Sequence, residues 1–163
     1  MSRAGRTISL TIPEHTAYLN VVRQAVGATA SLMGFDSTTV VQLQMAVDEA
    51  CTNVIEHGRA TVPSLGRSPG PSPGIRVKLT PLPGKLVMHL QDRCERFSPL
   101  EQQPADPDSY FRSPTHKGLG LAIIRGFVDE VRHRYRSGAG NELTLTKYLP
   151  GGRPARRPAR ARA

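Results

Sequence analysis

The stretch "LQMAVDEACTNVIEHG", residues 43–58, places three polar side chains at four-residue steps on one predicted helix: Glu49, Asn53 and His57. Residues four apart lie above one another on a helix, so these groups run beside its apolar stripe. That stripe consists of Val40, Leu43, Val47, Ala50 and Val54. An amphipathic helix with polar edges explains the pattern. A second explanation is chemical, because one helical turn sets a carboxylate base beside an amide oxygen that can bind a hard cation such as Mg²⁺.

The segments before this helix predict a strand and a further helix. Residues 6–12 alternate between apolar and polar side chains and predict a half-buried strand. A helix should follow, because apolar residues recur at helical steps: Leu19, Val22, Val26, Ala30 and Met33. Gly34 should end it. Asp36 or Ser37 should cap the quoted helix, and Gly58 stands where a helix C-terminal glycine belongs.

The segments after this helix predict loops, strands and a last helix. Residues 59–74 are rich in proline and glycine and predict a loop, and residues 75–90 predict a hairpin turned at "PLPG". Residues 98–117 form a second long polar stretch, which in a compact domain usually means a lid or functional loop. The segment 118–131, "GLGLAIIRGFVDEV", predicts a helix with one apolar face, and "NELTLTKYL", 141–149, predicts the final strand. The apolar face holds Leu121, Ile124, Val128 and Val131.

Length and composition favour one soluble domain. The chain has 163 residues, which suits a single domain. No apolar run approaches the ~20 residues of a membrane span, and the N-terminus has no apolar segment typical of a signal peptide. A cytoplasmic protein without a membrane anchor is therefore expected. Cys51 and Cys94 lack zinc-site spacing and are expected to be free thiols.

The positive charge is concentrated in the C-terminal tail. The net charge is +9, and five arginines of residues 150–163 account for five of the nine. Residues 150–163 contain three prolines and no large apolar side chain, which predicts that this tail is disordered. It serves either as a solubilising tail or as an electrostatic contact to nucleic acid or an acidic partner. The mildly basic body does not by itself predict direct binding of nucleic acid.

Two further segments carry candidate chemistry. Asp92 ends the second strand of the hairpin in "LQDRCERF". Gly118 and Gly120 let the backbone approach a ligand where the last helix begins, and a helix N-terminus attracts phosphate. The chain has no G-x-x-x-x-G-K-[ST] motif and no G-x-G-x-x-G after its first strand. A P-loop NTPase and a dinucleotide-binding fold are thereby excluded.

In this order, the three segments resemble the GHKL ATPase family with its Bergerat nucleotide-binding fold, and within it the anti-sigma-factor serine/threonine kinases of the RsbW and SpoIIAB type. "AVDEACTNVIEHG" resembles the N box, "DRCERFSP" the G1 box and "GLGLAIIRGFVDEV" the G2 box. The resemblance covers residues 6–149. It implies a two-layer α+β sandwich with a mixed, mostly antiparallel sheet and helices on one face. The predicted kinase domain spans residues 1–149, and residues 150–163 form the tail.

The resemblance implies a role for each candidate residue. Glu49 would be the general base that takes a proton from a substrate serine, and Asn53 would bind the Mg²⁺ that bridges the ATP phosphates. Asp92 would accept a hydrogen bond from the adenine amino group. Residues 98–117 would form the ATP lid. Three backbone N–H groups would contact the phosphates, those of Gly118, Leu119 and Gly120.

Two polar residues next to these segments have less specific explanations. Lys117 is a cation beside the glycines, and it either reaches a phosphate or is a solvated lid residue. His57 is expected to cap or pack the helix end rather than to catalyse.

The chain departs from the family pattern at three places. Cys94 stands where the G1 box usually has glycine, with Arg96 two residues later, and His116 stands where a further G2 glycine is common. The loop 59–74 is longer than the usual connection. We expect the side chain at position 94 to narrow the adenine pocket or to shift the turn.

Two functional classes follow. In the first, the protein is a kinase that binds a sigma factor and phosphorylates a serine of a STAS-domain antagonist with Mg-ATP, and the family implies a homodimer. In the second, the same fold is a regulatory binding module with weak or lost nucleotide binding. Cys94 favours the second class, whereas intact Glu49, Asn53 and Asp92 favour the first. A sensor histidine kinase is disfavoured, because no helical hairpin with a phosphoacceptor histidine precedes the domain.

Overall fold

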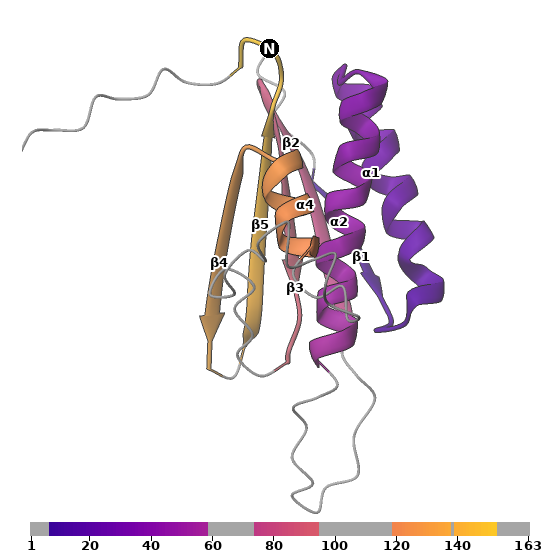
Figure 1. Cartoon of the computed structure of the whole chain (residues 1–163), viewed down its shortest axis with the longest axis vertical. Helices are drawn as coiled ribbons and strands as arrows, with labels where there is room; N and C mark the ends of the chain where they lie inside the picture. Colours follow the sequence, from indigo (N-terminus) through magenta and orange to yellow (C-terminus); the bar gives the residue numbers. More distant parts are fainter. Residues whose placement is uncertain (1–6, 59–73, 95–118, 138, 153–163) are drawn as a thin grey trace, which may run out of the picture.

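The computed structural model describes residues 7–58, 74–94, 119–137 and 139–152, which form a five-stranded antiparallel sheet with three α-helices side by side on one face (Figure 1). The strand order is β1-β2-β3-β5-β4, and all four pairings are antiparallel. The predicted two-layer α+β fold is confirmed. The elements are β1 (Ile8–Ile12), a 3₁₀ turn (Thr16–Tyr18), α1 (Leu19–Met33), α2 (Ser37–Gly58), β2 (Ile75–Leu82), β3 (Lys85–Gln91), α4 (Leu119–Phe127), β4 (Glu130–Arg136) and β5 (Gly140–Tyr148).

The boundary between α1 and α2 forms as predicted. Gly34 has a φ of 91°, and its N–H donates to the carbonyls of Ala30 and Ser31. Glycine adopts this left-handed conformation without the steric cost of a side chain. Asp36 caps α2, because its carboxylate accepts hydrogen bonds of 2.9 Å from the N–H and from the hydroxyl of Thr39. The backbone bond, followed by the hydroxyl bond, holds the pKa of Asp36 below its usual value.

The hydrophobic core lies between the sheet and the helices. Alternate residues of β2 and β3 point toward the helices and are buried: Ile75, Val77, Leu79, Leu86, Met88 and Leu90. The predicted stripes of α1 and α2 pack against them. Helix α2 also buries Ala46, Cys51 and Ile55, because it contacts α1 on one side and α4 on the other. Each large apolar side chain buried here stabilises the fold by ~1.5–3 kcal/mol, so α2 is held rigidly over the sheet.

The hairpin turn is shorter than predicted. Pro81 pairs with Leu86 and Leu82 pairs with Lys85, so the two strands continue through part of the "PLPG" segment. The turn is made at Pro83 and Gly84, and Gly84 has a φ of 76°. A two-residue connection suits an antiparallel hairpin, whose strands lie side by side.

The last predicted helix is wrong at its C-terminal end. Helix α4 ends at Phe127, and strand β4 follows where the helix was predicted to continue to Val131. The N–H of Asp129 donates to the carbonyl of Thr146 at 2.8 Å, so the chain joins the sheet at this point. Val131 packs on the core from β4 instead of from the helix.

Several predicted features lie outside the described residues. These are residues 59–73 of the proline-rich loop, the lid segment 98–117 and residues 153–163 of the tail. The division into a domain of residues 1–149 and a disordered tail therefore stays a prediction. In the part of the chain that the structure describes, no helix has both the length and the apolar character of a membrane span.

Candidate functional site

Glu49 and Asn53 lie one turn apart on α2, at the edge of its buried face. Both are half-buried, and the intervening Ala50 and Cys51 are buried in the core. The neighbouring carboxylate, Asp48, instead pairs with Arg23 of α1 at 2.9 Å. Among the described residues Glu49 has no ion pair. The helix therefore presents one uncompensated carboxylate beside one amide, as the sequence predicts.

The environment of Glu49 makes its carboxylate a stronger base. Burial raises the pKa of Glu49 above its usual value, and the negative charges of Glu56 and Asp48 raise it further. A general base is most effective when its pKa lies near the working pH, so this shift suits proton abstraction. Both carboxylates that raise the pKa of Glu49, Glu56 and Asp48, lie on α2 itself.

Glu49 lies directly against the first turn of α4. Gly120 is the second residue of that helix and is buried, and a Cβ built on it would overlap the Glu49 carboxylate. A glycine is therefore required for the approach. Because the N–H groups and the dipole at a helix N-terminus attract anions, the carboxylate of α2 lies next to a natural phosphate site. Two of the three predicted segments meet at this contact.

Asp92 follows β3 with an oriented, buried carboxylate. Asp92 is 7% exposed. Oδ1 accepts hydrogen bonds from the Cys94 N–H and from Nδ2 of Asn141, both at 2.9 Å. Oδ2 has no hydrogen-bond partner among the residues that the structure describes. One oxygen thus fixes the side chain, and the other is available to an amino group such as that of adenine.

Cys94 closes the turn that orients Asp92. Burial raises the pKa of its thiol to about 12, and the Asp92 charge adds to the shift. Cys51, buried in α2, has a pKa raised to about 12 by burial and then by Asp48. Both are free cysteines, as predicted, and both thiols are protonated at neutral pH.

Asn141 is a residue of this site that the sequence interpretation missed. It is 6% exposed in β5, and its carbonyl accepts the N–H of Asp92 at 3.1 Å. Its side-chain Oδ1 lies 3.2 Å from Nε2 of His133. A chain of polar contacts therefore runs from His133 through Asn141 to the Asp92 carboxylate. The sequence signal was an amide in the core-facing column of β5, two residues before Leu143 and four before Leu145.

Gly140 allows β5 to begin close to the Asp92 turn. It has a φ of 88°, and a Cβ there would overlap the carbonyl oxygen of Asp92. The sequence interpretation passed over this glycine. Its position before a strand and after a turn was the available signal.

The remaining predicted site residues are described only in part. Lys117 and Gly118 lie outside the described residues, as do Arg96 and His116. Leu119 is the first residue of α4, but its side chain is not described. The side chain of His57, in the last turn of α2, is likewise outside the described set.

The donor set fits a nucleotide-bound Mg²⁺ rather than a protein-enclosed metal. The described residues hold no group of three His, Cys, Asp or Glu side chains that could hold a metal ion. Mg²⁺ in phosphate sites usually has one or two protein oxygens, and substrate phosphates and waters supply the rest. The half-buried amide of Asn53, one turn from Glu49, suits that role.

Comparison with known proteins gives one family over most of the chain. Residues 12–147 match the family model described as "Histidine kinase-like ATPase domain". Serine-protein kinase RsbW of Bacillus velezensis is 29% identical over 160 residues, which cover 94% of this chain and 92% of that protein. The Bacillus subtilis protein of the same name is 27% identical over 153 residues, with coverage of 90% and 88%.

A solved structure has the same fold. The crystal structure of the RsbU and RsbW domains of a Mycobacterium tuberculosis protein aligns with a TM-score of 0.59 and 22% identity. The alignment covers 93% of this chain and 34% of that longer one. At this identity the likeness concerns the fold alone.

Proposed function

The chain belongs to the histidine kinase-like ATPase domain family, and from this membership we propose that it is an ATP-dependent serine/threonine protein kinase acting as an anti-sigma factor. In this proposal it binds a sigma factor and phosphorylates a serine of a STAS-domain antagonist. The names of its relatives, serine-protein kinases, support the reaction class. A cytoplasmic homodimer is part of the same proposal.

The contact between Glu49 and Gly120 carries the proposal. It brings a carboxylate with a raised pKa to the N-terminus of α4, where phosphate groups bind favourably. A phosphotransferase needs its base beside the transferred phosphate, because the attacking hydroxyl must be aligned with the phosphorus.

Each residue then has one task in the transfer. The serine oxygen attacks the γ-phosphorus while Glu49 takes the hydroxyl proton, and the bond to the bridging oxygen breaks as ADP leaves. The amide oxygen of Asn53 would hold Mg²⁺. When bound, this ion neutralises and orients the phosphates. Backbone N–H groups at and just before the start of α4 would donate to the phosphate oxygens, those of Gly118, Leu119 and Gly120, and Lys117 would add a cation beside them.

Asp92 gives the site its preference for adenine. Its Oδ2 accepts a hydrogen bond from the exocyclic amine, while Asn141 and the Cys94 N–H hold Oδ1 in place. Asn141 is therefore a positioning residue. The orientation costs little entropy on binding, because the carboxylate is already fixed.

The second candidate is a regulatory binding module with weak nucleotide binding. It is favoured by Cys94, whose half-buried side chain stands in the turn beside Asp92. This candidate keeps capture of a sigma factor and omits the phosphate transfer. A measurement of nucleotide binding distinguishes the kinase from the binding module.

Replacing Asp92 with asparagine is expected to weaken ATP binding by roughly tenfold or more, about 1.4 kcal/mol. The new carbonyl can still accept from Cys94 and Asn141, so the turn survives. Its amide NH₂ then faces the amine of adenine, and two donors meet without an acceptor. Calorimetry measures the change, and circular dichroism monitors the fold.

GTP is the matched control ligand for this substitution. Its base presents a carbonyl where adenine presents an amine, so the variant should lose the preference of the wild type for ATP. If the wild-type protein releases no heat with millimolar ATP, the kinase proposal fails and the binding module takes its place.

Replacing Gly120 with alanine is expected to slow phosphate transfer about tenfold or more while the melting temperature stays nearly unchanged. The new methyl group would overlap the carboxylate and Cγ of Glu49, so the half-buried Glu49 side chain must change rotamer and leave its position. Initial rates and thermal melts measure the two effects. Gly126→Ala on the same helix is the control, because a Cβ there meets nothing within 4 Å. Equal rates in both variants would contradict the assigned position of Glu49.

A further inference from the structure

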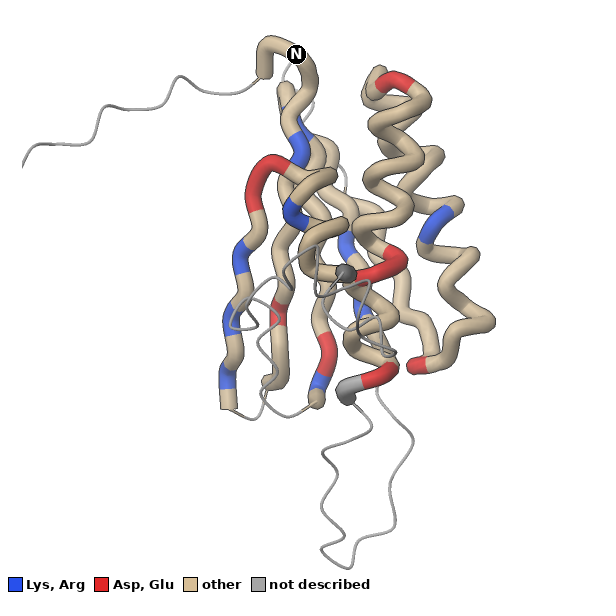
Figure 2. The backbone as a smooth tube through the Cα atoms, in the orientation of Figure 1, with Lys and Arg blue, Asp and Glu red and all other residues tan. Residues whose placement is uncertain are grey.

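The face of the sheet opposite the helices is basic. Residues directly across an antiparallel ladder share a face, so Arg76, Gln91, Glu142 and Arg134 form one row across four strands. Lys78, His89, Thr144 and Arg132 form the next. Strand β4 contributes Arg132, Arg134 and Arg136, and Figure 2 shows cations along this strand. We call this surface the open face; its cations are Arg76, Lys78, Lys85, Arg132, Arg134 and Arg136.

Most of these cations have no carboxylate partner. The two carboxylates of the open face are Glu130 and Glu142. Glu130 accepts a hydrogen bond of 2.7 Å from the Tyr148 hydroxyl and one of 3.0 Å from Arg132. Glu142 accepts one of 3.1 Å from Gln91.

Lys85 lies over the Tyr148 ring, with its Nζ 5.5 Å from the ring centroid, and four cations are left over. Arg76, Lys78, Arg134 and Arg136 form no ion pair with any residue that the structure describes. Three of them are exposed, and Lys78 is half-buried. Like charges gathered on one surface repel one another, so a bound anionic partner would relieve this repulsion.

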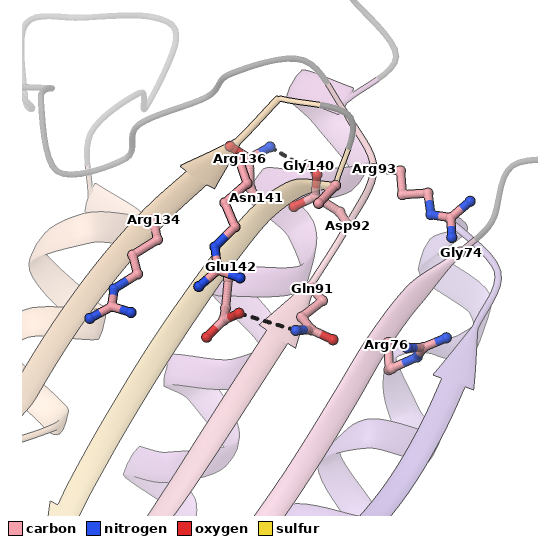
Figure 3. A pocket seen from close by; sticks show the side chains of 11 residues that line it. Gly74, Arg76, Gln91, Asp92, Arg93, Arg134, Arg136, Gly140, Asn141 and Glu142 are labelled. Atoms are coloured by element: carbon pink, nitrogen blue, oxygen red, sulfur yellow. Dashed lines mark hydrogen bonds between the residues drawn. The ribbon is translucent and has the colours of Figure 1, made fainter.

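The open face is also hollowed. A hollow of about 400 Å³ lies at its end near Gly140, where Asp92 and Asn141 also line it, and a second of about 410 Å³ is lined by residues that include Lys78 and His89. In Figure 3 the bonded Gln91–Glu142 pair lies between arginines on both sides. The arginines of the first hollow are Arg76 and Arg93 on one side and Arg134 and Arg136 on the other.

The distance between the cations of β2 and the cations of β4 fits the width of a helix. β2 and β4 are separated by β3 and β5, which is three strand spacings or ~14 Å. An α-helix with its side chains is ~10–12 Å wide. A helix lying along the strands would therefore have the β2 cations at one flank and the β4 cations at the other. Its carboxylates recur every turn, ~5.4 Å, close to the ~6.8 Å between alternate residues of β4.

We propose that the open face binds an acidic helix of a partner protein, seated between β2 and β4. Arginine forks match carboxylates in a bidentate geometry. A nucleic acid fits less well, because its phosphates would meet Glu130 and Glu142. Base stacking also needs aromatic rings, and the described open-face residues offer two: Tyr148 at the end of β5, and His89, whose Nδ1 lies 3.1 Å from the Thr144 hydroxyl. The site lies on the opposite face of the sheet from Glu49, so it is separate from phosphate transfer.

The test uses the full-length protein and a labelled helical peptide of alanine and glutamate, with the glutamates on two flanks. Fluorescence anisotropy gives its Kd. Arg76→Glu/Arg134→Glu, which reverses one cation on β2 and one on β4, should weaken binding roughly tenfold. Arg125→Glu on α4 and Arg134→Glu change the net charge equally. The first should alter the Kd less than about twofold and the second at least about threefold.

Amide chemical shifts locate the contact independently of the arginine tail. Titration of the peptide should shift residues 76–78 and 132–136 and leave α1 unchanged. Equal losses in Arg125→Glu and Arg134→Glu, or shifts outside these strands, would overturn the proposal. So would a duplex DNA of equal charge that binds more tightly than the peptide. The peptide Kd is measured in the absence of nucleotide, so failure here is distinct from failure of the kinase proposal.

Discussion

Replacing Glu49 with alanine is expected to lower phosphate transfer to a STAS-domain serine by ~10²–10⁴, the usual contribution of a positioned general base. ATP affinity should stay close to the wild-type value, because the carboxylate acts on the serine proton rather than on the nucleotide. Initial rates at saturating ATP measure the first effect, and calorimetry measures the second. Sigma-factor capture should persist, since it depends on the assembled surface.

The pH dependence of transfer provides a second readout of Glu49. Burial, then the charges of Glu56 and Asp48, raises its pKa, and only the ionised form accepts a proton. Activity should therefore fall as the pH drops through this raised pKa, at a higher pH than an ordinary glutamate would give. Glu56→Gln is the control. It removes one of the two charges, so the acid limb should move to lower pH while the maximal rate is kept.

A Glu49→Ala protein that transfers phosphate at the wild-type rate would refute the general-base assignment. The carboxylate would then be only the polar edge of an amphipathic helix. The same conclusion follows if the acid limb is identical in wild type and Glu56→Gln.

Replacing Asn53 with alanine is expected to weaken Mg-ATP binding and to lower transfer together, with transfer reduced by about 10² or more. The amide oxygen is the proposed Mg²⁺ ligand, so its loss leaves the phosphates without a positioned cation. Calorimetry with Mg-ATP and with ATP in a chelator measures the binding, and initial rates measure the transfer. The variant should bind ATP equally in both conditions.

Asn53→Asp separates a ligand role from a packing role. Aspartate has nearly the same shape and keeps an oxygen for the cation, so Mg²⁺ dependence should be retained. If Asn53→Ala keeps full Mg²⁺ dependence, or if Asn53→Asp loses as much as Asn53→Ala, the ligand assignment is wrong.

The local features were predictable because neighbouring residues determine them. Gly34 ends α1 through its left-handed backbone, and Asp36 caps α2 through hydrogen bonds to Thr39 three residues away. The apolar stripes of both helices and the alternation in β2 and β3 follow from periods that any segment carries in its own sequence. The position of Asn53 one helical turn after Glu49 was likewise predictable, because residues four apart lie on the same side of a helix. The family resemblance supplied the proposed roles.

The last helix shows where local periodicity misled. Leu121, Ile124 and Val128 are buried at helical steps, and Val131 continues that spacing. The chain nevertheless leaves the helix near Asp129, because its N–H pairs with Thr146 of β5. The strand pattern of β4 was present as alternating arginines, but it overlapped the helical one.

By itself the sequence determined the end of α1, the cap of α2, the apolar stripes, the hairpin and the alignment of Glu49 with Asn53, all of which depend on residues a few positions apart. Only the tertiary structure decided three other features. It set Gly120 against Glu49, Asn141 against Asp92 and the cations of β2 opposite those of β4. The partners in each case are separated by tens of residues. Sheet order and helix packing bring them together, and no period within one segment encodes that distance.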